Sequence, residues 1–432
     1  MKRIPLCLTL LFAFLTGVSL FAQHQDLDST DPKVRQKAVK SLASGDRGQA
    51  RSCEALSPLV GDPSADVRGE VVIALIKLGG PQCLEPLRAA TKDADPNIQS
   101  AAVDGLVNFY IPGYVKFGWL NSMKSFGSQV TKRFSSPEPL VVQPSVQVME
   151  ADTLAIAPLI SGGSSMASRA NAARAAGILR GAQAVPQLTE ALSAADSTIV
   201  IESLRALEKI GDLSVGPAVV PSLSSTDSDV REVAAHAVGQ LQAKDGVADL
   251  ARLAAGDRSK SVRRAALVAL AKIRDNGEDR TFLTFLRDKD EQMRAAAAEG
   301  LGRGGDPDDL RTINDAFASE KKESARLSMA FAAVHLGDLN KVTYLVDGLD
   351  SSVHRGEARA FLIELARKPE VLAKLYAPMS NGTRGQKLEL AVVVARSGTS
   401  ESLPHMQRLT SDPDTRVAQT AIRELKNLQS RL

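Results

Sequence analysis

Residues 227–241, DSDVREVAAHAVGQL, contain the pattern from which the architecture follows. Asp227 is followed three residues later by an apolar residue and an arginine, Val230-Arg231. Small or aliphatic residues then stand four, five, eight and eleven places after Val230. Offsets of four, eight and eleven fall on one side of a helix with 3.6 residues per turn. The segment therefore predicts a helix that Asp227 caps at its start and that buries one apolar stripe.

The same pattern returns along most of the chain. The apolar position, which we call the reference residue, recurs at Val34, Val67, Ile98, Ser168, Ile199, Val230, Val262, Met293, Ala325, His354, Gln386 and Val417. The steps between consecutive reference residues agree within a few positions, except that the step from Ile98 to Ser168 is more than twice as long as the others. Such regular spacing predicts a tandem array in which each copy is one structural unit.

Each copy also carries the signals that begin and end a helix. An Asp stands three residues before the reference residue, where it can cap the first turn, at Asp31, Asp95, Asp196, Asp227, Asp290 and Asp414. A Gly stands twelve residues after it, where a left-handed residue can end the helix, at Gly79, Gly211, Gly305, Gly337 and Gly398. A second, shorter helix is expected in each copy, for example over 185–188. Two short helices cannot bury both apolar stripes alone, so neighbouring copies must stack.

This unit resembles the HEAT repeat, particularly the short bacterial type of the phycobilisome lyases, over about residues 27–432 with one interruption. The resemblance implies an all-α fold, an α-solenoid of about twelve helix pairs wound as a right-handed superhelix, and implies little about function. In HEAT repeats the residue after the reference position is commonly an Arg that interacts with Asp residues along the stack. The matching residues, which we interpret as structural, are Arg35, Arg68, Arg169, Arg231, Arg263, Arg294, Arg326 and Arg355. Any such ladder is expected to break at Gln99, Val200, Lys387 and Ala418.

The segment 1–22 differs from the repeats. Lys2 and Arg3 precede an uncharged apolar run that ends at Ala22, an order typical of a secretory signal. We therefore expect an exported chain, periplasmic or secreted, with an uncleaved N-terminal anchor as the alternative. Export would permit a disulfide between Cys53 and Cys83, which lie in adjacent repeats. The sequence does not place their Cβ atoms together, and two free thiols between helices are the simpler interpretation.

The long step from Ile98 to Ser168 predicts an insertion over 111–148, between the two helices of the third repeat. It divides the chain into a signal (1–22), N-terminal repeats (23–110) and further repeats (149–432). No acidic residue stands between Gly105 and Pro137. The candidate partner-binding residues are the aromatic and basic ones gathered there, Tyr110, Tyr114, Phe117, Trp119, Lys124 and Arg133. They either pack on the solenoid, which we favour, or form an exposed patch for a partner protein, a polyanion or an anionic membrane surface.

Motifs for catalysis do not support an enzyme. Residues 300–305 match GxGxxG, but they end a predicted helix instead of following a strand. The chain has no GxxxxGK, GxSxG, HExxH or CxxC motif. Deoxyhypusine hydroxylases, which are HEAT-like, hold iron through His-Glu dipeptides. No histidine here is followed by Glu, and we expect no metal and no cofactor.

These observations favour a non-catalytic protein-binding scaffold or adaptor in the bacterial periplasm or cell envelope. The formal net charge of +3 does not indicate a nucleic-acid binder. One alternative is a lyase-like or hydroxylase-like enzyme with its site in the concave groove. The other is a peripheral protein that binds a membrane surface through the insertion. The identity of a protein partner does not follow from the sequence.

Overall fold

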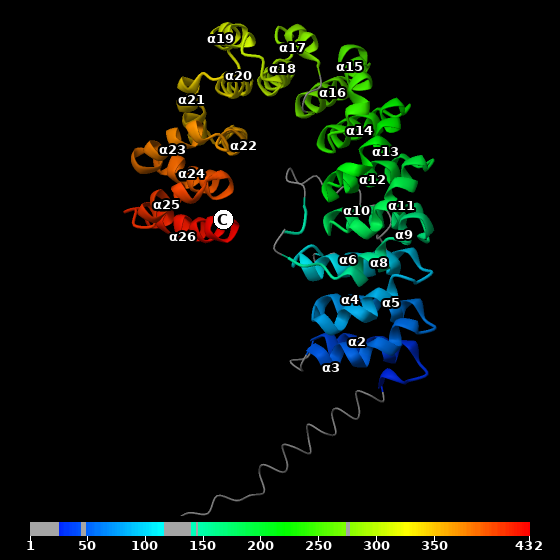
Figure 1. The fold of residues 1–432 in the computed structure, drawn as a ribbon. Coiled ribbons are helices and arrows are strands. Elements are labelled where there is room, and N and C mark those ends of the chain that lie inside the picture. Colours follow the sequence, from blue (N-terminus) through cyan, green and yellow to red (C-terminus); the bar gives the residue numbers. More distant parts are fainter. Residues whose placement is uncertain (1–25, 45–48, 116–139, 144–145, 274–276) are drawn as a thin grey trace, which may run out of the picture. The chain divides into compact units, whose positions relative to one another are not determined.

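The computed structural model describes residues 26–44, 49–115, 140–143, 146–273 and 277–432 (Figure 1). The chain divides into two compact units, Met1–Ser222 and Leu223–Leu432. Within the described ranges the regular structure is helical and contains no strand. The prediction of an all-α array of stacked helix pairs is therefore confirmed. The handedness of the superhelix stays a prediction.

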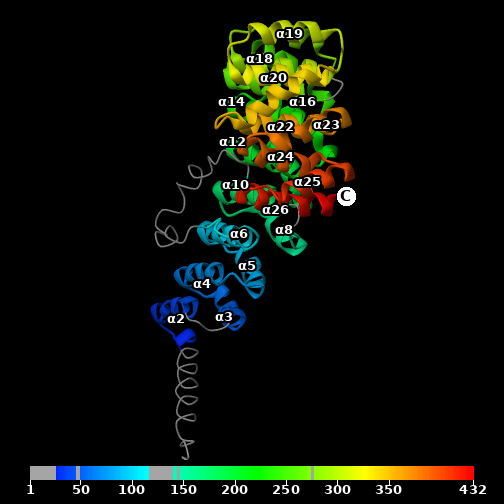
Figure 2. The ribbon, with the colours of Figure 1, turned by 90° about the vertical axis from the view of Figure 1, so that its left-hand side faces the viewer.

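The first unit has two layers of helices (Figures 1 and 2). The longer first helices pack on one another in chain order: α2 (Pro32–Ser44), α4 (Ala65–Leu78), α6 (Pro96–Tyr110), α10 (Met166–Ile178) and α12 (Ser197–Ile210). The shorter second helices are α3 (Gln49–Leu56), α5 (Leu84–Ala90), α8 (Glu150–Ile156), α9 (Leu159–Gly162), α11 (Val185–Glu190) and α13 (Gly216–Val219). The interval between α6 and α8 contains the predicted insertion.

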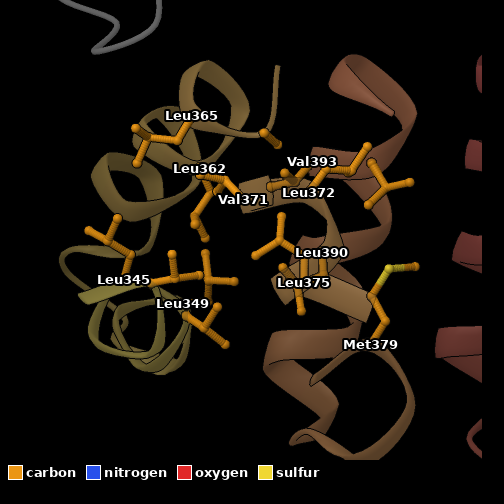
Figure 3. Packing of buried hydrophobic residues seen from close by; sticks show 14 of the residues in the cluster. Leu345, Leu349, Leu362, Leu365, Val371, Leu372, Leu375, Met379, Leu390 and Val393 are labelled. Carbon is orange, nitrogen blue, oxygen red and sulfur yellow. The ribbon is translucent and has the colours of Figure 1, made fainter. Parts of the chain in front are cut away.

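The second unit repeats this arrangement. Its first helices are α14 (Ser228–Gln240), α16 (Lys260–Lys272), α18 (Glu291–Gly304), α20 (Glu323–His335), α22 (Arg355–Leu365), α24 (Arg384–Ser397) and α26 (Thr415–Arg431). Its second helices are α15 (Val247–Gly256), α17 (Asp279–Phe285), α19 (Asp309–Ser319), α21 (Val342–Asp347), α23 (Pro369–Asn381) and α25 (Leu403–Leu409). Leu362, Leu375 and Leu390, from three consecutive helices, share one buried apolar cluster (Figure 3). Stacking thus makes the core continuous from repeat to repeat.

The predicted N-terminal caps are confirmed. Asp95, Asp196 and Asp414 each accept two backbone N–H groups of the first turn. Asp227 and Asp290 accept one each, and so does Asp31, from the N–H of Lys33. These carboxylates satisfy donors that have no partner inside the helix.

The prediction of left-handed helix ends is confirmed at four glycines and wrong at the fifth. Gly79, Gly211, Gly305 and Gly337 have φ values of 69°, 75°, 78° and 110°. Gly398 instead has φ −67° and ψ 166°, because the chain continues there in extended form into Thr399, which caps the next turn. Arg180 and Gln242, also twelve residues after their reference residues, are left-handed without being glycine, at φ 52° and 53°.

A ladder of ion pairs links successive repeats. Its members join a cation after one reference residue to an acid five residues before the next: Arg35–Asp62 (2.6 Å), Arg68–Asp93 (2.6 Å), Arg231–Asp257 (2.9 Å), Arg294–Glu320 (2.6 Å) and Lys387–Asp412 (2.8 Å). The expected break at Lys387 is therefore wrong, because its ammonium group reaches Asp412 in the same way as an arginine.

Four of the predicted arginines are held differently. Arg169, Arg263 and Arg355 donate to main-chain carbonyl groups that stand six or nine residues earlier in the chain. The guanidinium group of Arg326 lies over the rings of Phe317 and Tyr344. In the repeat of Arg263, the next residue pairs with Asp290 instead. Each of these arginines thus contacts structure of its own repeat or of a neighbouring one.

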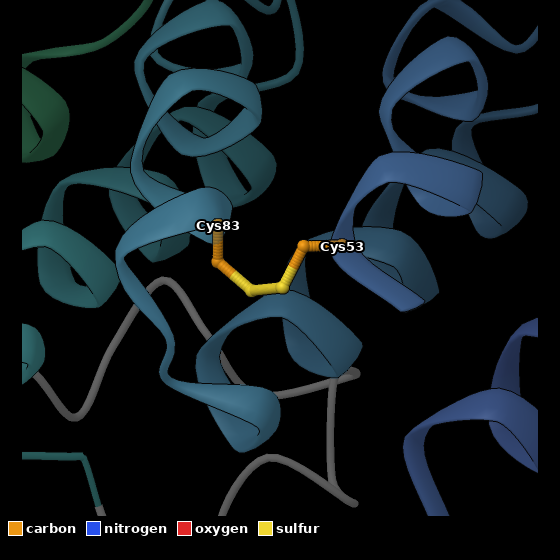
Figure 4. The surroundings of a disulfide bond; sticks show 2 residues. All are labelled: Cys53 and Cys83. Carbon is orange, nitrogen blue, oxygen red and sulfur yellow. A yellow bond between two sulfur atoms is a disulfide. The ribbon is translucent and has the colours of Figure 1, made fainter. Parts of the chain in front are cut away.

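A disulfide joins the first two repeats (Figure 4). Cys53 lies in α3, and Cys83 ends the 3-10 helix η2 (Pro81–Cys83) that precedes α5. Their Cα atoms are 5.1 Å apart, within the range of natural disulfides. The interpretation as two free thiols is corrected, because stacking brings together two residues that are 30 positions apart.

Candidate partner-binding site

The structure describes the two ends of the insertion but not its centre. Phe117, Trp119, Lys124 and Arg133 lie outside the described residues. Tyr110, the last residue of α6, and Tyr114, near the N-terminal end of the insertion, lie within them. The described part of the site is its attachment to the helices.

The base of the insertion is closed by Tyr110. Its hydroxyl group donates to Asp152 Oδ2 at 2.5 Å and accepts the backbone N–H of Met149 at 3.0 Å. Asp152 is fully buried, and its other oxygen pairs with Arg88 at 2.5 Å. Burial, followed by the bond to Asp152, raises the pKa of Tyr110 to about 12, so the hydroxyl group remains a donor at neutral pH.

This geometry changes the interpretation of Tyr110. Its hydroxyl group connects the last residue of α6 with the residue before α8, so that the chain leaves and returns at one place. Its ring packs edge-to-face on Phe109 at 5.0 Å. Both ends of the side chain thus have partners inside the protein, so Tyr110 supports the base of the insertion, and its part in partner binding stays a prediction.

The described parts of the insertion on either side of its centre, an N-terminal arm (111–115) and a C-terminal arm (140–143), are both bonded to first helices. On the N-terminal arm, buried Val115 donates its N–H to the side chain of Asn108 in α6 at 2.9 Å. On the C-terminal arm, buried Val142 donates its N–H to the carbonyl of Ile178 in α10 at 2.8 Å. The insertion is therefore attached to the solenoid at its base and at two further points.

A buried polar cluster crosses the same helices. Asn171 Nδ2 donates to Asp104 Oδ1 at 2.9 Å, and Arg174 pairs with Glu202 Oε2 at 3.1 Å. Arg174 also donates to the Asn171 side chain at 3.4 Å. Arg205 pairs with the second oxygen of Glu202 at 3.1 Å. Asp104, Asn171, Arg174 and Glu202 are all at least nine-tenths buried, so these groups connect α6, α10 and α12 through interactions shielded from water.

Burial is the main cause of the pKa shifts in and around this cluster. Burial raises the pKa of Asp104 to about 6, against the opposing effects of Asn171 and Arg174. Burial also raises the pKa of Tyr114, and the charge of Asp104 adds to that rise. Burial lowers the pKa of Lys209. The influence of Asp104 and Arg174 on Tyr114 places the N-terminal arm within electrostatic range of the cluster.

The sequence analysis missed this cluster, although a signal was present. Asp104 and Arg174 stand six residues after their reference residues, and Asn171 and Glu202 stand three residues after theirs. Offsets of three and six share one helix face, and polar residues there in adjacent repeats indicate side chains that can meet. This signal lies in the helices that hold the insertion and not in its aromatic composition.

Groups of metal ligands and membrane-spanning helices are two features that the described residues lack. Within them, no three His, Cys, Asp or Glu side chains are grouped as metal ligands. In the same ranges, no helix has both the length and the apolar character needed to cross a bilayer. The charged groups of the cluster bond to one another, so they hold the helices that carry the insertion.

Comparison with known proteins identifies the repeat. The family model described as HEAT repeats matches residues 24–107, 155–237 and 216–284. The interval between 107 and 155, where the insertion lies, falls outside the matched segments. No curated protein matches the chain.

Several solved structures are similar to the chain. An engineered protein is 20% identical, with 94% of this chain and 98% of that chain covered and a TM-score of 0.30. The karyopherin Kap121p, bound to the extreme C-terminus of the protein phosphatase Cdc14p, is 12% identical. The match covers 93% of this chain and 48% of the karyopherin, with a TM-score of 0.39. Kap121p bound to Nup53p has the same identity and coverage and a TM-score of 0.38. The chain thus spans about half the length of the karyopherin.

Proposed function

Since this chain belongs to the HEAT-repeat family over residues 24–107 and 155–284, we propose that it is a non-catalytic scaffold that binds a protein partner through its insertion. A HEAT solenoid suits this role because its stacked helices offer an extended surface to another chain. The observation that carries the proposal is the closed base, where the Tyr110 hydroxyl group binds both Met149 and Asp152. Loops held on a rigid frame are where binding residues concentrate.

The composition of the insertion supports the same site. Trp, Tyr and Arg are the side chains that most often dominate the energy of protein interfaces. The interval 116–139 contains the only Trp of the chain, Trp119, together with Phe117, Lys124 and Arg133. Residues 116–139 follow directly after the arm that buried Val115 fixes to α6. We place the partner-binding residues in this interval.

We further propose that the protein acts in the bacterial periplasm or cell envelope. The support is the order of residues 1–22, in which two basic residues precede an uncharged apolar run. The disulfide between Cys53 and Cys83 also suits an oxidising compartment. Fusion of residues 1–22 to a reporter that is active only after export tests this location. A reporter retained in the cytoplasm would contradict it.

Substitution of Trp119 tests the binding site. The exported, tagged full chain is crosslinked in an envelope extract, and its partner is identified and titrated. Trp119→Ala is expected to weaken that binding by about 2 kcal/mol or more with an unchanged melting temperature. Leu213→Ala is the matched control, because it truncates an apolar side chain that is 58% exposed in the same unit. Unchanged binding with a lower melting temperature would show that Trp119 packs inside the protein and would contradict the proposal.

Removal of the insertion gives a second test. Residues 116–139 are replaced by a short Gly-Ser linker, which keeps Val115, Val142 and the Tyr110 base. The helical signal and melting temperature should stay close to those of the intact chain, because insertions between packed elements are tolerated. Partner binding should be lost. If the shortened chain still binds the partner, the site lies on the repeats.

The absence of acids between Gly105 and Pro137 favours one alternative, the membrane-surface binder. Four basic residues stand in that interval, and such segments bind anionic lipids. Lys124→Glu/Arg133→Glu distinguishes the two functions. A membrane-surface binder would lose sedimentation with anionic vesicles, whereas a protein scaffold would show no sedimentation with them at all. No cluster in the described residues favours the enzyme alternative.

A further inference from the structure

The first repeat has a small apolar core. Among its described residues the buried apolar side chains are Leu27, Ala38, Val39, Cys53 and Leu56. The second repeat buries more than twice as many: Val67, Val71, Val72, Ala74, Leu75, Ile76, Leu78, Cys83, Leu84, Leu87 and Ala90. Because stability from packing scales with buried apolar area, packing alone holds the first repeat less firmly than the second.

The polar contacts between the two repeats add little to this packing. Lys40 pairs with Glu70 at 3.3 Å, but the Lys40 side chain is 58% exposed. Lys77 reaches Ser44 at 3.4 Å, in an exposed contact. Exposed pairs of this kind contribute little to stability, because water screens the charges and the long side chains lose freedom when they pair. The shielded ion pair of Arg35 with Asp62 is the exception, and it holds α2 to the turn before α4.

The disulfide is placed where this weakness lies. Cys53 belongs to the second helix of the first repeat, and Cys83 stands just before the second helix of the next. The two residues are 0% and 1% exposed, so their sulfur atoms are inside the interface. A covalent bond there limits how far α3 can move from α5.

We propose that the Cys53–Cys83 bridge is a redox-controlled staple that keeps the first repeat packed on α4 when oxidised and allows it to open when reduced. Formation of the bridge joins the two sulfur atoms and releases two protons and two electrons. A disulfide-containing oxidant accepts them, as when oxidised glutathione is reduced to two thiols. The inference concerns residues 26–90 and does not depend on the partner-binding role of the insertion.

The expected size follows from loop closure. The bridge joins residues 30 positions apart. Closing a loop of that length lowers the entropy of the opened first repeat enough to change the equilibrium between its packed and opened states by about several hundredfold. Because the sulfur atoms are buried, reduction should itself require opening and be slow without denaturant. The first repeat should then behave as a separate opening unit of the array.

Amide hydrogen exchange on the intact chain tests the staple. Peptides from α2 and α3 should exchange on the order of a hundredfold faster after reduction, while peptides from α24 should be unchanged. Reduction leaves both sulfur atoms in place, so no cavity is created. Cys53→Ala/Cys83→Ala should show the same fast exchange in α2 and should not respond to added reductant.

Three results would overturn the proposal. Equal protection of α2 and α3 in the oxidised and reduced chains would show that packing alone holds the first repeat. Equal loss of protection in α24 would show a general effect of reduction. Two alkylatable thiols after denaturation of the exported Cys7→Ser chain would show that the bridge does not form.

Discussion

Two glycines in the second unit should respond oppositely to the same substitution. Gly302 lies in α18, where an added Cβ atom would stand 2.7 Å from the Cα and 3.0 Å from the Cβ of Ala332 in α20. Favourable carbon contacts begin at about 3.5 Å, so the two helices would have to separate by roughly 0.8 Å. The obstructing atom belongs to the main chain, and no change of rotamer can remove it.

The magnitude follows from two opposing terms. Overpacking costs about 1–3 kcal/mol, and the upper part of that range, about 2–3 kcal/mol, applies here because the obstructing atom belongs to the main chain. Replacement of Gly by Ala inside a helix returns about 1 kcal/mol through helix propensity. Gly302→Ala should therefore lower the free energy of unfolding by about 1–2 kcal/mol. Gly356→Ala, in α22, has no atom within 4 Å of the added Cβ and should raise the free energy of unfolding by about 0.5–1 kcal/mol.

Urea unfolding followed by circular dichroism measures both variants, and amide exchange locates the change in α18 and α20. Ala332→Gly combined with Gly302→Ala should restore little stability, because the contact at 2.7 Å is with the Cα atom, which remains. A Gly302→Ala protein as stable as the unmodified chain would refute the reasoning. So would full rescue by Ala332→Gly.

Further predictions concern charge and backbone conformation. Burial raises the pKa of Asp104 to about 6, so this carboxyl group binds its proton more tightly in the folded chain than in the unfolded chain. Protonated Asp104 therefore stabilises the fold at low pH, and this contribution is lost as pH rises from about 4 to 6. As pH rises from about 4 to 7, the free energy of unfolding of Asp104→Asn should therefore increase by about 2 kcal/mol relative to that of the unmodified chain. Urea unfolding at each pH measures this difference. The bond from Arg294 lowers the pKa of Glu320 to about 2, so its contribution is present above about pH 4.5 and is lost as pH falls toward 2. In Arg294→Gln the free energy of unfolding should fall much less between about pH 4.5 and 2 than it does in the unmodified chain. Arg180→Gly, at an exposed left-handed residue, should raise the melting temperature through relief of up to about 1 kcal/mol of strain, and a lower value would contradict that account.

Much of the fold could be predicted because its signals are local. A capping Asp acts on N–H groups two or three residues away, and an apolar stripe needs only the 3.6-residue period. The recurrence of these signals at a nearly constant spacing also required that the helix pairs stack. Gly398 shows the limit of this reasoning, because its conformation depends on Thr399 and the turn that follows.

The candidate site could be located from composition, but its attachment could not. Tyr110 is bound to Asp152, 42 residues further along, and Asn171 to Asp104, 67 residues back. Such pairs depend on how far each first helix is shifted along its neighbour, which local periodicity leaves open.

The same limit applies to covalent and ionic links between repeats. Cys53 and Cys83 stand at different places in their repeats, so the spacing of the array does not bring them together until α3 and η2 are packed. Lys387 reaches Asp412 because the turn before α26 lies within the length of its side chain. Periodicity and capping are properties of single helices, whereas burial and pairing belong to the contacts between them.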